Sequence, residues 1–265
     1  MKSLFSPSVV REQMNHFATA FLLTLVFFFT QNATSVFAKE ERCKVGDPSV
    51  AEYNKLSPSE QKEMIEDLRK EHKSEMEMTV VAFESFFPKV PIEIRNRLKT
   101  VASIQEKLVR KGYKCFSSLT DVAGVMLVIP NYGAIPMATH TIENEFDVKE
   151  KIDIINDERG NGYRAIHYVV IVDARHVEIQ IHTARGNIWA FLIHELVYKG
   201  PYEEKSDVDK YLVEVSRRIF LLDSGFTTQI PPIPDHLPAP AKTKIEEALH
   251  KVRNITKAGF SPQKK

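Results

Sequence analysis

The sequence predicts an α/β fold of the α+β type, with a mixed β-sheet flanked by helices. Runs with helical periodicity alternate with short apolar runs, of which residues 122–129, VAGVMLVI, are continuous enough for a central strand. Only the residues Asp-Ala-Arg at 173–175 separate two later strand-like runs, and so short a turn implies an antiparallel hairpin. A hairpin among interspersed helices and strands favours a mixed sheet over a purely parallel one.

The composition bounds the class of protein. The chain has 265 residues, of which 43% are hydrophobic, enough for one sizeable core or one core with helical appendages. With 36 basic and 35 acidic residues, the net charge of +1 gives no overall attraction to nucleic acid or to an anionic membrane. The two cysteines, Cys43 and Cys115, could pair in an oxidising compartment or stay unpaired, and spacing alone does not decide between these states.

Residues 1–38 have the features of a secretory signal peptide. A basic start precedes the apolar run at residues 17–29, and Val36 and Ala38 occupy the small-residue positions of a cleavage site. The apolar run is shorter than the roughly 20 residues of a membrane span. We therefore expect cleavage and a secreted or periplasmic protein without stable membrane association. A retained signal that anchors the chain is the alternative.

The remaining chain predicts the elements in order. Residues 39–54 are expected to be irregular, and Ser57-Pro58 opens a helix over residues 58–87, because serine caps helices and proline fits the first helical position. A second helix is expected over residues 92–111, ended by Gly112. Its apolar residues recur every three or four positions: Ile94, Leu98, Val101, Ile104 and Leu108.

The second half of the chain continues the alternation. After the strand at 122–129, the patterns predict a helix over 133–145, a short strand within 146–155, hairpin strands over 165–172 and 176–182, and helices over 186–198, 206–222 and 241–254. The five prolines of IPPIPDHLPAPAK indicate a rigid linker before the last helix.

Two carboxylates are candidates for a metal site. Asp121 stands at the start of the apolar strand, and Glu178 stands in the middle of another strand. Neighbouring strands can direct both carboxylates to one point, where they would hold Mg²⁺ together with substrate phosphates. The alternative is that Asp121 caps a turn and Glu178 points to solvent.

Cations and an aromatic residue complete a possible nucleotide site. Arg97, Lys99, Lys107, Arg159 and Arg164 could neutralise a polyphosphate, although each one alone is more simply a solvated surface charge. Tyr163, after the glycines of the segment GNGY, could stack on a base or pack against its hairpin. Together these features suggest phosphoryl or nucleotidyl transfer, in which positioning and charge neutralisation do most of the catalysis.

Four sequence blocks in the same order resemble the synthetase domain of RelA/SpoT-type alarmone (ppGpp) synthetases, especially the single-domain small alarmone synthetases. The blocks are RLKTVASIQEKL (97–108), DVAG (121–124), RGNGYRAIH (159–167) and VEIQIHT…WAFLIHELVYK (177–199). The resemblance covers about residues 60–222 and implies a nucleotidyltransferase-like fold. Together with the patterns described above, the expected division of the chain is a signal peptide (1–38), an irregular segment (39–54), the synthetase domain with flanking helices (55–225), and a proline-rich linker with a short helix and basic tail (226–265).

The resemblance implies Mg²⁺-dependent transfer of pyrophosphate from ATP to the 3′-hydroxyl of GDP or GTP. By motif, Asp121 would bind Mg²⁺, and Glu178 would share the metal and activate the acceptor hydroxyl. The implied ATP-binding residues are Arg97, which stacks on adenine, Lys99, Ser103 and Lys107, which hold phosphates, and Met126. The implied acceptor residues are Arg159, Asn161, Tyr163, His167, Gln180 and His194.

The chain departs from the family pattern at four positions. Met126 and His182 stand where the family has arginines, Ala165 replaces a serine, and Ile193 replaces a glutamate. These departures leave two alternatives open. One is transfer to adenosine nucleotides or a tRNA 3′ end, as a toxin or effector; the other is a nucleotide-binding pseudo-enzyme. A homo-oligomer is compatible with each alternative.

Overall fold

The computed structural model describes Cys43, residues 47–155 and residues 160–255. The predicted signal peptide, Arg159 and the end of the basic tail lie outside these residues. All described helices and strands lie in residues 48–255. None of the described helices is both long enough and apolar enough for a membrane span. Neither cysteine is a free thiol, because Cys43 and Cys115 are both disulfide-bonded.

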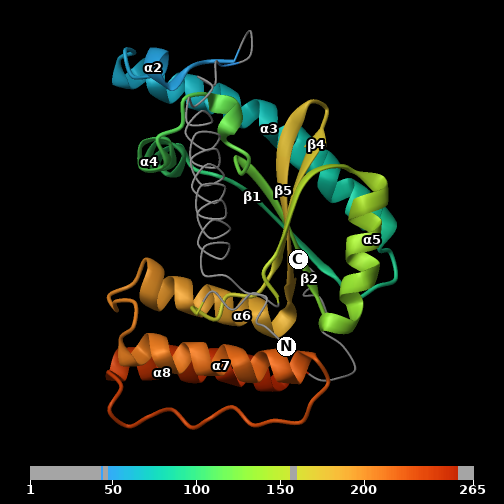
Figure 1. The fold of residues 1–265 in the computed structure, drawn as a ribbon, viewed down its shortest axis with the longest axis vertical. Coiled ribbons are helices and arrows are strands. Elements are labelled where there is room, and N and C mark those ends of the chain that lie inside the picture. The colour runs from blue at the N-terminus through green and yellow to red at the C-terminus, as the bar shows by residue number, and fades with distance from the viewer. Residues whose placement is uncertain (1–42, 44–46, 156–159, 256–265) are drawn as a thin grey trace, which may run out of the picture. The chain divides into compact units, whose positions relative to one another are not determined.

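A mixed five-stranded sheet forms the centre of the domain, as the sequence predicted (Figure 1). Its strand order is β1-β2-β5-β4-β3. The strands are β1 (Glu93–Leu98), β2 (Ala123–Ile129), β3 (Asp147–Asp153), β4 (Ile166–Val172) and β5 (Arg175–Thr183). β2 and β5 are parallel, and the other three pairs are antiparallel. The predicted hairpin is the β4–β5 pair, and its turn residues Asp173 and Ala174 both have positive φ, 45° and 66°, as a type I′ turn requires.

The helices lie at the two faces and at one end of this sheet (Figure 1). They are α2 (Val50–Tyr53), α3 (Pro58–Phe86), α4 (Val101–Lys111), α5 (Ile135–Glu145), α6 (Ala184–Ile193), α7 (Asp207–Asp223) and α8 (Ala239–Asn254), with a π-helical turn at His194–Tyr198. Ser57 and Glu60 form a capping box around Pro58, so α3 begins where the sequence predicted. Gly112 ends α4 in the left-handed conformation, with φ of 60°.

The predicted helix over residues 92–111 is wrong in its first part. Residues 93–98 form strand β1, paired antiparallel with β2, and α4 begins only after the N-cap Thr100. The apolar pattern misled because Ile94 and Leu98 are four positions apart, a spacing that fits one face of a strand as well as one face of a helix. Both side chains pack on the sheet core, so the arginines at odd positions of β1 face the other way.

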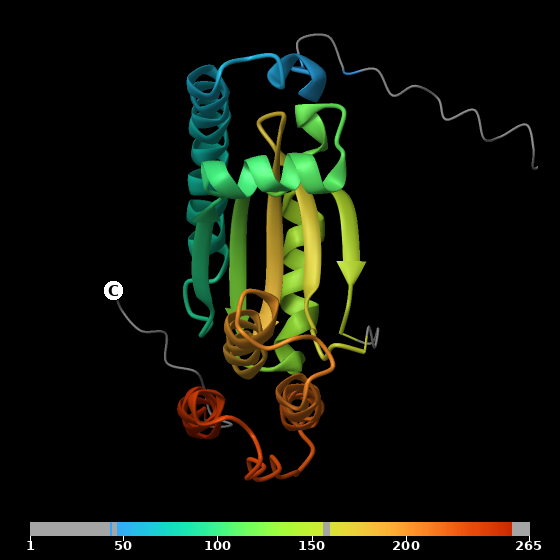
Figure 2. The ribbon, with the colours of Figure 1, turned by 90° about the vertical axis from the view of Figure 1, so that its left-hand side faces the viewer.

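The two faces of the sheet differ in polarity. One face packs its aliphatic side chains against α3 and α5, which supply Met76, Phe83, Ala138 and Ile142 to the same core. Figure 2 looks onto the opposite face, where α4 crosses in front of one end of the strands and α6 lies in front of the other end. The middle of this second face carries polar side chains, which line a cavity among the described residues.

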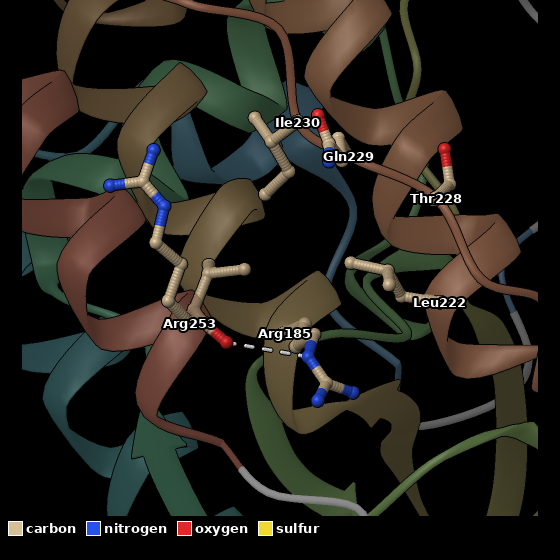
Figure 3. Close-up of a pocket in the computed structure, with 7 residues that line it drawn as sticks. Arg185, Leu222, Thr228, Gln229, Ile230 and Arg253 are labelled. Atoms are coloured by element: carbon tan, nitrogen blue, oxygen red, sulfur yellow. Dashed lines mark hydrogen bonds between the residues drawn. The ribbon is translucent and has the colours of Figure 1, made fainter.

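A second core joins α6, α7 and α8. The proline-rich segment leads into α8, whose Ala241, Ile245 and Leu249 are buried against the other two helices. Arg185, at the start of α6, donates to the fully buried Asp223 Oδ1 at 2.6 Å and to the Val252 carbonyl at 3.3 Å. Burial raises the pKa of Asp223, against the hydrogen bonds from Thr183 and Arg185 that lower it. Figure 3 shows this arginine at the edge of a cavity of about 410 Å³ between the helices.

The imidazole of His182 on β5 is buried, with 2% exposure. Burial lowers its pKa from 6.5 to about 4, although Glu178 acts in the opposite direction. His182 is therefore neutral at pH 7. Because its pKa is lower in the folded state than in the unfolded state, folding stability is lost as the pH falls from 6.5 to about 4.

We expect His182 to contribute about 3 kcal/mol to this acid destabilisation, from the size of its pKa shift. His182→Gln should flatten the dependence of the unfolding free energy on pH between 6.5 and 4, as measured by urea unfolding at each pH. His250→Gln, at an exposed position of α8, should leave the pH dependence unchanged. An identical slope in wild type and His182→Gln would contradict the prediction.

Candidate functional site

The polar face of the sheet presents its side chains in cross-strand rows. In one row, Gly124 on β2 lies between Arg97 on β1 and Glu178 on β5. In the next row, Met126 lies between Arg95 and Gln180. Because side chains of a strand alternate between faces, the parallel register of β2 and β5 brings Glu178 and Gln180 to the same face as the β1 arginines.

These rows form the floor of a cavity of about 240 Å³. Five residues predicted from the sequence line it together: Arg97, Asp121, Met126, Glu178 and Gln180. Arg95 and Asn96 also line it. Gly124 adds no side chain to the middle of the floor, where a Cβ would lie 4.0 Å from Glu178 Oε2.

Asp121 stands at one end of the cavity, where β2 begins beside α4. Lys99 Nζ and Lys107 Nζ both donate to its Oδ2, at 2.6 and 2.7 Å. Burial raises the pKa of Asp121, but the hydrogen bonds and charges of Lys107 and Lys99 together outweigh burial and leave the pKa below its usual value. The second oxygen, Oδ1, is buried without a hydrogen-bond partner among the described residues. Asp121 is thus an ionised carboxylate with one free oxygen.

The first turn of α4 adds donors to the same end of the cavity. Thr100 caps the helix by accepting from the Ser103 amide at 3.2 Å, and its hydroxyl donates to Ser103 Oγ at 2.9 Å. The Ser103 hydroxyl proton therefore remains available to a ligand. The helix N-terminus and the two lysines make this end favourable for anionic phosphate groups.

Glu178 is held in place by two neighbours. Gln180 Nε2 donates to its Oε2 at 2.8 Å, and His167 Nδ1 lies 3.3 Å from its Oε1. Burial raises the pKa of Glu178, but the hydrogen bonds from His167 and Gln180 lower it, and the pKa lies below its usual value. The charge of Asp121 acts on Glu178 in the raising direction, as expected for two carboxylates at one site. Glu178 is ionised at neutral pH.

A chain of hydrogen bonds continues from Glu178 through two histidines and a tyrosine. Tyr163 Oη lies 2.8 Å from His167 Nε2 and 3.3 Å from His182 Nε2. His182 Nδ1 is buried without a partner among the described residues. A buried N–H without an acceptor would cost about 1–3 kcal/mol, so the proton of His182 is placed on Nε2. His182 then donates to Tyr163, Tyr163 donates to His167, and His167 donates to Glu178, so every donor in the chain points toward the carboxylate.

The glycine-rich segment positions Tyr163. Gly162 has a φ of 76°, and a Cβ at this position would lie 2.9 Å from Ser216 Cβ and 3.0 Å from Trp189 Cζ2. Asn161 Oδ1 accepts from the Tyr163 amide at 3.1 Å, while its Nδ2 donates to Tyr198 Oη at 2.9 Å. The segment therefore needs glycine at 162 for both conformation and space.

Two of the predicted site residues, Arg164 and His194, do not line the cavity. Arg159 lies outside the described residues. Arg164 Nη1 donates to the Ile155 carbonyl at 2.5 Å, and its guanidinium lies 4.5 Å from the centroid of the Phe220 ring of α7. His194 is exposed in the π-helical turn and does not line the cavity. Lys107, in contrast, lies at the end of the cavity, where it forms an ion pair with Asp121.

Sequence reasoning missed Arg95 and Asn96 because it placed them on a helix. The signal that could have identified the strand is the two-residue spacing of Ile92 and Ile94 and of Arg95 and Arg97, with the apolar pair on the core side and the basic pair on the cavity side. The role of His182 at the end of the hydrogen-bond chain was also missed, because no local pattern shows a contact with Tyr163.

Comparisons with known proteins cover this same region. Residues 96–203 match the family model described as the region found in RelA / SpoT proteins. GTP pyrophosphokinase YjbM of Bacillus subtilis (strain 168) is 34% identical over 122 residues, which are 41% of this chain and 58% of that protein. GTP pyrophosphokinase YwaC of the same strain is 31% identical over 141 residues, 47% of this chain and 65% of that protein. The chain therefore spans less than two thirds of the length of these two curated relatives.

The fold is also similar to that of a solved relative. The crystal structure of small alarmone synthetase 1 from Bacillus subtilis superposes with a TM-score of 0.52 at 28% identity, over 62% of this chain and 94% of that chain. The family match contains Asp121, Glu178 and the glycine-rich segment, and the solved relative has the same α+β arrangement. Residues 96–203 are therefore similar in sequence to the region found in RelA / SpoT proteins, and the fold is similar to that of a small alarmone synthetase.

Proposed function

We propose that the protein transfers pyrophosphate from ATP to the 3′-hydroxyl of a guanosine nucleotide. The observation that supports this proposal is that two ionised carboxylates, Asp121 and Glu178, line one cavity. Asp121 pairs with two lysines through one oxygen, and its other oxygen is buried without a hydrogen-bond partner among the described residues. Glu178 has hydrogen-bond donors oriented toward it. The relatives named GTP pyrophosphokinase supply the reaction class and the guanosine acceptor.

The donor nucleotide fits the α4 end of the cavity. Lys99, Lys107 and the Ser103 hydroxyl would hold the phosphates of ATP, because Lys99 and Ser103 lie at the N-terminal end of α4 and Lys107, further along the helix, pairs with the same Asp121 carboxylate as Lys99. Arg97, on the strand that leads to Lys99, would stack its guanidinium plane on the adenine. In this arrangement, the phosphates would lie toward Asp121 and the base along β1.

The acceptor fits the β4 side of the cavity. Tyr163 would stack on the guanine, and Asn161, His167 and Gln180 border the same region through their hydrogen bonds to Tyr163 and Glu178. Glu178 would take the proton of the 3′-hydroxyl. The hydroxyl oxygen then forms a bond to the β-phosphorus of ATP, the bond from that phosphorus to the bridging α–β oxygen breaks, and AMP leaves.

The residues of the cavity fit Mg²⁺. Asp121 Oδ1 is a buried carboxylate oxygen without a partner, and Glu178 offers a second carboxylate in the same cavity. Mg²⁺ prefers one or two carboxylates together with substrate phosphates. When bound, the ion would neutralise phosphate charge during transfer.

The proposal is tested by incubating the protein with ATP, Mg²⁺ and GDP, GTP, adenosine nucleotides or tRNA, and resolving the products. We expect transfer to a guanosine nucleotide, and Glu178→Gln should lower its rate by about 100-fold or more, since general-base catalysis contributes 10²–10⁴. Glu106→Gln, at an exposed position of α4, is the matched control and should retain full activity. Transfer to an adenosine nucleotide or tRNA alone would replace the proposed acceptor, and no transfer to any acceptor would overturn the proposal.

The metal site is tested separately from turnover. Asp121→Asn should abolish the increase in melting temperature that Mg²⁺ with a non-hydrolysable ATP analogue gives to the wild type, because the amide cannot bind Mg²⁺ as the carboxylate does. Asp147→Asn, exposed on β3, serves as the control. If Asp121→Asn keeps the full Mg²⁺-dependent increase, Asp121 is not a metal ligand.

We also propose that the protein is exported. The apolar run at residues 17–29 and the small residues before position 39 support a cleaved signal peptide, and the disulfide-bonded state of both cysteines suits an oxidising compartment. The mature N-terminus, determined by mass spectrometry of the protein recovered outside the cytoplasm, should begin near residue 39. A protein found entirely in the cytoplasm with residues 1–38 intact would contradict export.

A further inference from the structure

We propose that Arg95 is a donor-base residue, which together with Arg97 encloses the base of ATP from the β1 side of the cavity. This inference rests on the proposed function for the identity of the donor. Arg95 lies one residue outside the stretch 96–203 that matches the RelA/SpoT region, so the family match assigns it no role.

The strand geometry gives the two arginines the spacing that a planar ring needs. Arg95 and Arg97 are two residues apart on β1, and both line the 240 Å³ cavity. Residues two apart on a strand face the same side and are separated by about 6.6 Å. A flat base between two guanidinium planes requires two van der Waals contacts of about 3.5 Å each, or about 7 Å in all.

The residue that lies across the strand pair from Arg95 also supports this inference. Arg95 is the direct cross-strand partner of Met126, which also lines the cavity. Directly paired residues on one face have Cβ atoms about 4.5–5.5 Å apart, so the two side chains border the same space. The Met126 thioether can pack on a base but carries no charge. Arg95 is therefore the charged member of this cross-strand pair at the cavity.

The charge of Arg95 is available to a ligand. Its side chain is 49% exposed, and Arg95 Nε donates to Glu93 Oε1 at 2.6 Å. An exposed ion pair of this kind contributes only about 0–1 kcal/mol, so a base can compete for the guanidinium or stack on it while the pair persists. Arg95 also borders a second cavity of about 390 Å³ between α6 and α8, so there is open space on both sides of its side chain.

The experiment measures binding of a non-hydrolysable ATP analogue by calorimetry, without turnover. Arg95→Ala should weaken binding about 10-fold, in the range of a stacked cation on a ring. Arg95→Lys should recover only part of this loss, because an ammonium lacks the guanidinium plane. Arg110→Ala, exposed on α4 and similarly paired with a glutamate, is the matched control and should bind as the wild type does.

The decisive variant restores the cation on the opposite strand. Met126→Arg in the Arg95→Ala background should return binding to within about 3-fold of the wild type, because the guanidinium would enter the same space from β2. Unchanged binding by Arg95→Ala overturns the inference, and so does a loss that Met126→Arg does not repair. A wild type that binds the ATP analogue but transfers pyrophosphate to no acceptor overturns the proposed function and leaves this inference standing.

Discussion

The parallel pairing of β2 with β5 is the constraint on which the candidate site depends. It sets Gly124 opposite Glu178 and Met126 opposite Gln180, with the aliphatic residues between them on the core side. A slip of one residue would turn Glu178 into the core, and burying an unpaired carboxylate is far more costly than any contact on the polar face could offset. The hydrophobic core under α3 and α5 therefore fixes the register of the strands, and this register brings Glu178 and Gln180 to the polar face of the sheet.

The electrostatics of the site follow from how each carboxylate is kept ionised. Asp121 is held by two lysines, and Glu178 by a one-directional chain of donors that ends at His182. The lysines that neutralise Asp121 are the same cations proposed to hold phosphates. A polyphosphate that attracts them would leave Asp121 more negative, and a divalent cation would then bind the carboxylate more strongly.

Much of this arrangement could be predicted from the sequence. The continuous apolar run gave β2, the short turn gave the β4–β5 hairpin, and the four motifs gave most residues that line the cavity. Strand β1 could not be predicted in the same way. The four-residue spacing of Ile94 and Leu98 fits one face of a helix as well as one face of a strand, and only the pairing with β2 decides between the two structures. The exposure of His194 depends on a π-helical turn, which has no sequence signal comparable to a cap or a turn residue.

The two departures from the family pattern inside the site have different physical consequences. Met126 removes a cation from the open cavity, where a neighbouring strand can supply another from Arg95. His182 stands at a buried position, where no solvent-exposed side chain can substitute for it. A neutral imidazole at that position avoids the cost of a buried charge and still donates to Tyr163, so the orientation of the chain toward Glu178 is preserved. Both substitutions therefore change the charge of the site without removing the carboxylates or the contacts that orient them.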